Sequence, residues 1–388
     1  YAEYLVYDLK TNQLHALDEE RSPQMLAEYS PDGTKVSYLF ENNLYVKELS
    51  SGKVKQMTKD GEKNKIVNGG TDWVYEEEFS ITKAYGWSPD SKYIAFLRFD
   101  ETNVPAFTMT YFSELYPDLY TFNYPKAGED NSKVTAHIAC VKNRKLKNID
   151  IGRYEYIPRL KWSNTENTLI VQTMNRHQSE LKYHKIVQEG KKWSSKAFYT
   201  ETSKTYIDVD DNLLILKDGK TILRTSEKDG FNHIYALGFD GDINAITSGN
   251  WDVIEFLGID EDKRRVYYAS AEKGAVHKGI YAINLDGSNK QSISSETGSN
   301  DAGFSTGMKF FVKSYSNANT PTVYSLCDQT GKELFVLEDN KLLKDKLSKY
   351  KLATQEFITV KGHEDDLNAY IIKPVDFDPA KKYPLYIH

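Results

Sequence analysis

Apolar and polar residues alternate along most of this chain in short runs, which is the pattern of β-strands with one buried face. The runs are bounded by Gly, Asn, Asp and Ser, which favour turns. Tyr, a residue that favours strands, occurs 28 times. Runs of this kind include KVSYLF, YIAFLRF, TLIVQT, RVYYAS and MKFFVKSY. The pattern predicts many short strands and few helices.

The predicted strands recur in a repeated unit. Residues 29–58 show it in full: a Ser-Pro-Asp-Gly turn, a strand, a polar hairpin tip, an aromatic strand, a Gly-containing turn and a last strand. Similar units begin at Trp87, Trp162, Leu216, Gly258 and Gly303. A repeat of about 40 to 55 residues with four strands is typical of a β-propeller blade. We therefore expect an all-β propeller. A β-sandwich is the alternative, but it would not need so regular a period.

Two segments depart from the repeat. The interval between Trp87 and Trp162 is too long for one blade and contains SELYPDLYTFNYPKAGEDNSK, so we place an inserted arm at about residues 111–133. After residue 342 the pattern changes to a linker or short helix, a hairpin and the apolar run YPLYIH, which is expected to be a strand. We expect a propeller domain at residues 1–342, and a linker with the first strands of a second domain at residues 343–388.

Composition limits the classes of function. The chain has 388 residues, 39% of them hydrophobic, which is enough for a large core and more than one ordinary domain requires. A net charge of −6 disfavours nucleic acid as a partner, because phosphate binding needs concentrated Lys and Arg. No apolar run approaches the roughly 18 to 20 residues that span a bilayer. The first residues, YAEYLVY, resemble a strand more than a secretory signal, so the sequence is expected to begin inside the fold.

Residues with metal-binding or redox chemistry show no characteristic spacing. The histidines are scattered, and HEDD at residues 363–366 is expected to be a polar hairpin tip. Cys140 and Cys327 are far apart and are expected to pack in strands, without a disulfide framework. We therefore expect neither a metal site nor another cofactor.

One match to the nucleophile motif Gly-x-Ser-x-Gly occurs, with Ser305 at its centre. In that motif an apolar strand precedes the serine and a helix follows it, and this sharp turn exposes the hydroxyl group. Here a polar segment precedes Ser305 and the strand MKFFVKSY follows it. We therefore expect Ser305 to lie in a blade turn and not to be catalytic.

The segment DWVYEEE at residues 72–78 contains three consecutive carboxylates. Asp72 is a favourable N-cap, and glutamates in a first helical turn suit the positive end of the helix dipole, so a short helix is expected. Successive helical side chains are offset by roughly 100°, so two adjacent glutamates can lean toward one cavity. Most acidic triplets only form a solvated surface, and the pattern alone leaves both interpretations open.

Several segments resemble the dipeptidyl peptidase IV family, serine peptidases of the prolyl oligopeptidase group that include fibroblast activation protein. The most specific is DWVYEEE, followed by WSPDSKYIAFLRFDETNVP and YPKAG. EKDGFNHIYAL, ITSGNWDVIEF, VLEDN and KKYPLYI continue the resemblance in the same order across nearly the whole chain. The lack of glycosylation sequons and of the disulfide set of mammalian members indicates a bacterial member.

The resemblance implies an eight-bladed propeller, its first blade incomplete here, followed by the truncated start of an α/β-hydrolase domain. In this family two adjacent glutamates of a short propeller helix bind the free α-amino group of a peptide, and they match Glu77 and Glu78. The family releases dipeptides with Pro or Ala in second position. Its Ser-Asp-His triad would lie beyond His388, so no catalytic residue is expected here and this chain alone is expected to be inactive.

The resemblance has two departures near the expected site. An arginine that precedes the family's first matching strand is not part of this sequence, and TSKTYIDVDDN at residues 202–212 stands in place of an Arg-Phe-Arg element. Contacts beyond the dipeptide are therefore expected to differ. The resemblance also implies a homodimer formed through the arm between Phe112 and Lys133, and a periplasmic or cell-surface location.

Two other functions stay open from the sequence. A free-standing propeller that binds peptides or partner proteins would need no hydrolase domain. A tripeptidyl peptidase or oligopeptidase relative would share the fold but differ in specificity, and it would not need an anchor at Glu77 and Glu78.

Overall fold

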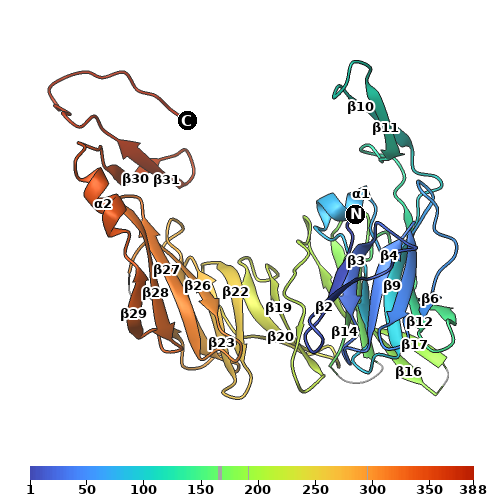
Figure 1. Ribbon diagram of the computed structural model, residues 1–388. Coiled ribbons are helices and arrows are strands. Elements are labelled where there is room, and N and C mark those ends of the chain that lie inside the picture. Colours follow the sequence, from blue (N-terminus) through green and yellow to red (C-terminus); the bar gives the residue numbers. More distant parts are fainter. Residues whose placement is uncertain (165–167, 191, 295) are drawn as a thin grey trace. The chain divides into compact units, whose positions relative to one another are not determined.

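The structure is a computed structural model that describes residues 1–164, 168–190, 192–294 and 296–388, and antiparallel sheets dominate it (Figure 1). The chain separates into two compact units. Unit 1 consists of Tyr1–Ile222 and Gly238–Asp242, and unit 2 of Leu223–Leu237 and Ile243–His388. The all-β class predicted from the alternation of apolar and polar residues is confirmed.

Unit 1 contains three larger sheets, two hairpins and one helix among its described residues. The hairpins are β1 (Leu5–Asp8) with β2 (Gln13–Ala16), and β10 (Ala106–Tyr111) with β11 (Asp118–Asn123). The first sheet has the order β3 (Met25–Tyr29), β4 (Lys35–Phe40), β5 (Asn43–Glu48), β6 (Val54–Gln56). The second has the order β13 (Leu146–Asn148), β12 (Lys133–Cys140), β9 (Tyr93–Asp100), β7 (Ile66–Asn68), with β8 (Tyr85–Trp87) also paired to β9. The third has the order β14 (Leu160–Trp162), β15 (Thr168–Met174), β16 (Glu180–Glu189), β17 (Lys192–Thr202), and the helix is α1 (Trp73–Glu78).

The remaining sheets follow the same sequential strand order. One contains β18 (Leu214–Ile215), β19 (Thr221–Ser226), β20 (His233–Gly238) and β21 (Ile243–Ala245). In unit 2 the next contains β22 (Val253–Asp260), β23 (Arg265–Ser270), β24 (Gly279–Asn284) and β25 (Gln291–Ser292). The last contains β26 (Ser299–Phe304), β27 (Phe310–Asn317), β28 (Thr320–Asp328) and β29 (Glu333–Glu338). Each of the six repeats found in the sequence therefore corresponds to one sheet.

The Ser-Pro-Asp turns of the repeat owe their shape to local hydrogen bonds. Ser30 Oγ donates to Asp32 Oδ1 at 2.6 Å and accepts from Lys35 N at 3.0 Å. Ser88 repeats the arrangement, donating to Asp90 Oδ1 at 2.7 Å and accepting from Tyr93 N at 2.9 Å. A side chain that bonds to the backbone a few residues away stabilises a turn, so the Ser-Pro-Asp sequence forms the same turn before a strand in both of these repeats.

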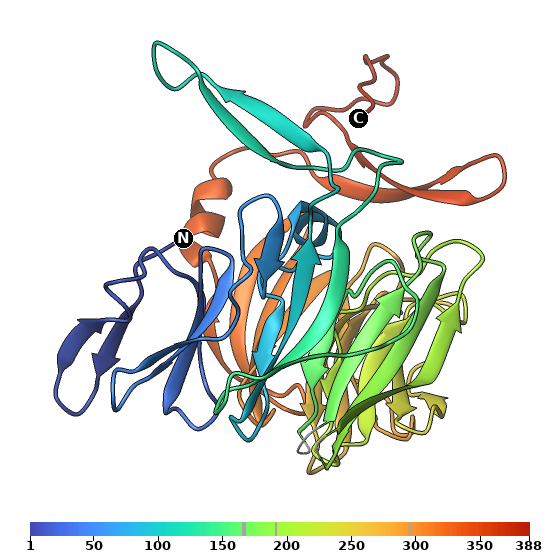
Figure 2. The ribbon, with the colours of Figure 1, turned by 90° about the vertical axis from the view of Figure 1, so that its right-hand side faces the viewer.

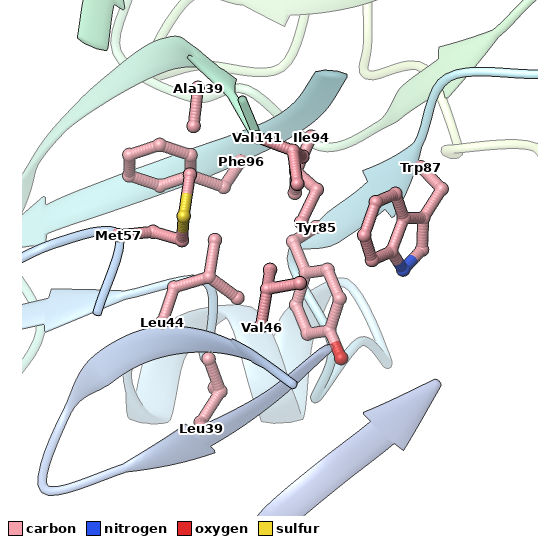
Figure 3. Packing of buried hydrophobic residues seen from close by; sticks show 10 residues of the cluster. All are labelled: Leu39, Leu44, Val46, Met57, Tyr85, Trp87, Ile94, Phe96, Ala139 and Val141. Atoms are coloured by element: carbon pink, nitrogen blue, oxygen red, sulfur yellow. The ribbon is translucent and has the colours of Figure 1, made fainter. Parts of the chain in front are cut away.

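The apolar faces of successive sheets in unit 1 pack against each other. β4, β5, β8, β9 and the end of β12 contribute buried side chains to one cluster, in which β4 and β5 belong to the first sheet and the others to the second. Figure 3 shows its members, which are Leu39, Leu44, Val46, Met57, Tyr85, Trp87, Ile94, Phe96, Ala139 and Val141. The polar atom of the Trp87 ring in this cluster has a hydrogen-bond partner, because Trp87 Nε1 donates to Ser37 Oγ at 2.8 Å. Face-to-face burial of this kind is how propeller blades are stabilised.

The hairpin β10–β11 projects from the rest of unit 1 (Figures 1 and 2). It carries exposed apolar side chains on one of its faces. Phe107 lies opposite Phe122 and Met109 opposite Tyr120 in the antiparallel register, so these four share one face. At its base, Asn123 Nδ2 donates to two backbone carbonyls, those of Asn64 and Glu101, at 2.8 and 3.0 Å. The base of the hairpin is thus held firmly while its apolar face stays open.

The last residues agree with only part of the expectation. A short helix α2 (Lys341–Leu347) precedes a hairpin of β30 (Gln355–Lys361) and β31 (Asp366–Ile372), whose tip carries HEDD as predicted. The run YPLYIH at residues 383–388 forms no strand, so that prediction was wrong for this chain. A strand is defined by hydrogen bonds to a neighbouring strand, and alternation or apolarity alone cannot supply that partner.

Candidate functional site

The acidic segment forms the predicted helix. Asp72 is the N-cap of α1 with extended backbone angles, and its Oδ1 accepts a hydrogen bond from Tyr75 N at 3.0 Å. This bond satisfies one of the free N–H groups of the first turn. Val74 and Tyr75 are buried, whereas Glu76, Glu77 and Glu78 are exposed. One face of α1 therefore fixes the helix and the other presents the three carboxylates.

Two buried contacts attach α1 to distant parts of unit 1. The second oxygen of the cap, Asp72 Oδ2, accepts a hydrogen bond from Ser132 Oγ at 2.6 Å. The hydroxyl of Tyr75 accepts a hydrogen bond from the backbone N–H of Ile157 at 2.7 Å. The Tyr75 ring packs edge-on against the rings of Phe79 and Phe99, with centroids 5.0 and 4.8 Å away. Although it has only six residues, the helix is held from several sides.

Glu78 lines a cleft of about 200 Å³ inside unit 1. Arg159, Gln178, Tyr206 and Asp208 also contribute to its walls. Glu77 is exposed on the preceding position of the helix but does not line this cleft. The structure thus brings the second of the two predicted glutamates to a cleft and leaves the first on the adjoining surface.

The segment that replaces the family's Arg-Phe-Arg element forms one wall of this cleft. It is attached by a hydrogen bond from Ile207 N to Gln178 O at 2.7 Å, and it supplies the exposed side chains of Tyr206 and Asp208. The cation in the cleft is Arg159, whose Nε donates to Asp211 Oδ1 at 2.9 Å. Because Asp211 compensates the Arg159 charge, the carboxylates of Glu78 and Asp208 give the cleft a negative character.

Sequence reasoning did not single out Arg159 or Gln178. They lie in loops far along the chain from the acidic triplet, and no local motif marks them. The hydrogen bond from Ile157 N to the Tyr75 hydroxyl attaches the segment that carries Arg159 to α1, and Gln178 is bound through its carbonyl oxygen by Ile207 N.

A polar network continues behind the helix. Asn131 Nδ2 donates to Glu155 Oε1 at 2.8 Å and to the Tyr156 hydroxyl at 3.0 Å, and Arg176 pairs with Glu155 at 3.2 Å. Burial raises the pKa of Tyr156, while the hydrogen bond from Asn131 opposes the rise and the charge of Glu78 adds to it. The network lines part of an open cavity of about 640 Å³, as does Ser132. Glu78 and Tyr156 are therefore electrostatic neighbours.

Two buried carboxyl groups, those of Asp72 at the start of α1 and of Glu101, interact electrostatically. Burial raises the pKa of Asp72, against the hydrogen bonds from Ser132 and Tyr75 that favour its charged form. Burial, and then the charge of Asp72, raise the pKa of Glu101 to about 7. The charge of Asp72 at the start of α1 thus acts on a second buried carboxyl group.

Other candidates from the sequence occupy structural positions. Ser305 follows β26 and leads into β27, and its Oγ accepts a hydrogen bond from Phe310 N at 3.2 Å, so it lies in a blade turn as predicted. Cys140 and Cys327 are free thiols in β12 and β28, as expected. Within the described ranges, no group of three or more His, Cys, Asp or Glu side chains is arranged to hold a metal ion. Nor does any helix in that part of the chain have the length and apolarity needed to cross a membrane.

Successive antiparallel sheets with sequential strand order define this chain as a β-propeller, and the first two of these sheets pack face to face. Comparison with known proteins then identifies its family. Residues 1–322 match the sequence profile of the dipeptidyl peptidase IV (DPP IV) N-terminal region, and the chain belongs to that family. The predicted resemblance and fold class are therefore confirmed, while the number of eight blades stays a prediction.

Individual relatives agree with this assignment. The chain is 30% identical to a probable dipeptidyl-aminopeptidase B of Phaeosphaeria nodorum and 29% identical to dipeptidyl peptidase 4 of Trichophyton rubrum, over 99% of its own length. Its structure is similar to that of Porphyromonas gingivalis dipeptidyl peptidase 4, with a TM-score of 0.91, 38% identity and coverage of 98% of this chain and 55% of the other. A putative dipeptidyl aminopeptidase IV of Bacteroides ovatus gives a TM-score of 0.78 at 25% identity, covering 99% of this chain and 56% of that one. The chain spans 46% and 52% of the two fungal relatives, about half of each.

Proposed function

We propose that this chain is the propeller portion of a serine-type dipeptidyl peptidase that releases X-Pro and X-Ala dipeptides from free peptide N-termini. Glu77 and Glu78 bind the substrate's α-amino group, and the propeller controls access. The observation that carries the proposal is the position of these carboxylates, exposed on a helix whose opposite face is buried and anchored. Glu78 lies in a cleft large enough for a small side chain.

The chemistry of the anchor follows from charge. The α-amino group of a peptide has a pKa of about 7.7 to 8.0 and is largely cationic at neutral pH. Two adjacent carboxylates repel each other, and an ammonium group between them relieves that repulsion and donates charge-assisted hydrogen bonds. A peptide with a blocked N-terminus offers no such cation. The site therefore selects free N-termini.

The same anchor determines where the chain is cut. An extended peptide advances by roughly 3.3 to 3.6 Å per residue, so an anchor about 7 Å from a nucleophile admits two residues. We place the nucleophile in the full-length protein, in an α/β-hydrolase domain with a Ser-Asp-His triad beyond His388. In that arrangement His activates Ser and backbone donors stabilise the oxyanion. Residues 1–342 form the propeller domain in this proposal, residues 343–388 begin the hydrolase domain, and the chain alone is inactive.

The proposal extends to assembly and location. The exposed apolar face of the hairpin β10–β11 supports a homodimer formed through this arm. Two lone cysteines, with no disulfide between them, are compatible with a bacterial protein of the periplasm or the cell surface.

The test uses steady-state cleavage of a Gly-Pro anilide by the full-length protein. Glu77→Gln and Glu78→Gln each remove one charged hydrogen-bond partner, which costs about 1.5 to 3 kcal/mol, or roughly ten- to a hundredfold in kcat/KM. Glu76→Gln is the matched control, since it changes an exposed carboxylate of the same helix. If Glu77→Gln and Glu78→Gln leave kcat/KM unchanged, as Glu76→Gln should, the triplet is only a solvated surface and the proposal is wrong.

A further inference from the structure

We propose that Ser132 is a positioning residue for the substrate's amino terminus, acting through the buried carboxylate of Asp72 on the helix that carries Glu77 and Glu78. The inference rests on the proposed function and concerns how its anchor is held. Ser132 belongs to neither the helix nor the acidic motif. It lies between the hairpin β10–β11 and strand β12.

The helix cannot hold its own position. A single isolated turn or two of helix is unstable in water, because nucleation fixes several residues for few hydrogen bonds. α1 has six residues, so its orientation is set by what it contacts. The carboxylates that bind substrate are on its last turn, whereas the capping residue is at its other end.

The cap is bound on two sides. Asp72 is 7% exposed, and its two oxygens have different partners: Oδ1 accepts from Tyr75 N within the helix and Oδ2 accepts from Ser132 Oγ at 2.6 Å. Ser132 is also 7% exposed. A hydrogen bond to a buried charged group is stronger than one between neutral groups, and losing it leaves the carboxylate oxygen unpaired. Ser132 is therefore a firm attachment point for the start of the helix.

The Tyr75 hydroxyl provides the second attachment. It accepts from Ile157 N at 2.7 Å, on a segment different from that of Ser132. Two attachments on separate segments restrain both the direction of the helix and its rotation about its axis. If the one at Ser132 is lost, the helix can pivot about Tyr75.

A small tilt of α1 displaces the carboxylate of Glu78, because Glu78 lies at the end of the helix. With a rise of about 1.5 Å per residue, Glu78 lies roughly 4.5 Å along the axis from Tyr75, so a tilt of about 10° about Tyr75 displaces it by about 0.8 Å. Misplacement of a binding group by about 1 Å can cost on the order of a hundredfold in rate. The structure thus links a serine outside the site to the geometry of the amine anchor.

The experiment measures discrimination for the amine. Gly-Pro anilide and acetyl-Pro anilide differ only in the ammonium group, so the ratio of their kcat/KM values isolates the contribution of the anchor. In the full-length protein, Ser132→Ala should lower this ratio about tenfold by slowing Gly-Pro cleavage, with acetyl-Pro cleavage unchanged. Ser132→Thr keeps the hydroxyl and should restore the ratio.

Ser88→Ala is the matched control. It removes a buried serine that donates to an aspartate at 2.7 Å, in the blade turn that follows β8. Both Ser→Ala variants should lower Tm, but only Ser132→Ala should lower the discrimination ratio. Equal ratios in the two variants overturn the inference. If Ser132→Ala does not fold, Tyr75→Phe tests the restraint on the helix at its second attachment. It should lower the discrimination ratio in the same way, and an unchanged ratio in Tyr75→Phe would overturn the inference.

A further comparison separates this inference from the proposed function. Ser132→Ala should have no additional effect on the ratio in a Glu77→Gln/Glu78→Gln background, because the anchor it positions is already lost. If the unmodified protein does not prefer Gly-Pro to acetyl-Pro anilide, the proposed function itself fails. If the preference exists and depends on Glu77 and Glu78 but not on Ser132, only the positioning role fails.

Discussion

The buried carboxyl group of Glu101 makes the stability of unit 1 depend on pH in an unusual direction. Glu101 directly follows β9 and is 8% exposed. Burial, and then the charge of Asp72, raise its pKa from 4.5 to about 7. The folded protein therefore holds a proton that the unfolded chain has already released at pH 6. Glu101→Gln removes this titration while keeping the size of the side chain.

The magnitude follows from the shift. One pKa unit corresponds to about 1.36 kcal/mol, so a rise from 4.5 to about 7 corresponds to about 3 kcal/mol. Glu101 holds its proton more tightly in the folded protein than in the unfolded chain. The protein therefore has its full stability below the unfolded pKa of 4.5 and loses part of it as the pH rises through the folded pKa of about 7. Between pH 5 and pH 8 the wild type should thus lose about 2 to 3 kcal/mol relative to Glu101→Gln.

Urea unfolding of both proteins at several pH values measures this difference. Infrared spectra should also show a protonated carboxyl band at pH 6 that is absent from Glu101→Gln. Glu364→Gln, in an exposed hairpin tip, serves as the control and should follow the wild type. The reasoning would be refuted if the free energy of unfolding changed with pH equally in wild type and Glu101→Gln and no band of a protonated carboxyl group appeared. The Glu101 carboxylate would then be in contact with solvent.

Two further predictions concern the core and the arm. Phe311→Ala removes a ring that is 1% exposed and should lower the free energy of unfolding by about 3 to 5 kcal/mol. Phe310→Ala, at a position that is 46% exposed, should lower it far less. Urea unfolding measures both variants, and similar decreases in the free energy of unfolding would contradict the assigned burial. On the hairpin, Met109→Glu and Tyr120→Glu place charges on the exposed apolar face and should convert a homodimer to monomers in sedimentation, while Thr110→Glu on the opposite face should leave the dimer intact. A dimer that survives the first two changes would exclude this face as the interface.

Features that depend on neighbouring residues could be predicted. The Ser-Pro-Asp turns form through hydrogen bonds that span two to five residues, as at Ser30 and Ser88. The cap of α1 spans three, from Asp72 to Tyr75. Ser305 could be assigned to a blade turn because the order of strand and turn around it is also local. In each case the partner atoms are fixed by chain geometry before any tertiary contact forms.

The run YPLYIH shows the limit of such reasoning. Its apolar residues favour a strand, but a strand also needs a neighbour to bond with, and nothing within the run reveals whether one is present. The same holds for the cleft beside Glu78, where Arg159 and Gln178 come from segments that have no motif of their own.

The sequence by itself determined the repeat of strands, the turns between them and the short acidic helix, because alternation and capping act over a few residues. Only the tertiary structure decided how that helix is held. The Tyr75 hydroxyl bonds to a residue 82 positions along the chain, and Asp72 bonds to Ser132, 60 positions away. Burial, which raises the pKa of Glu101, likewise depends on which segments pack together. Long-range packing is set by the free energy of the whole fold, and no local pattern records it.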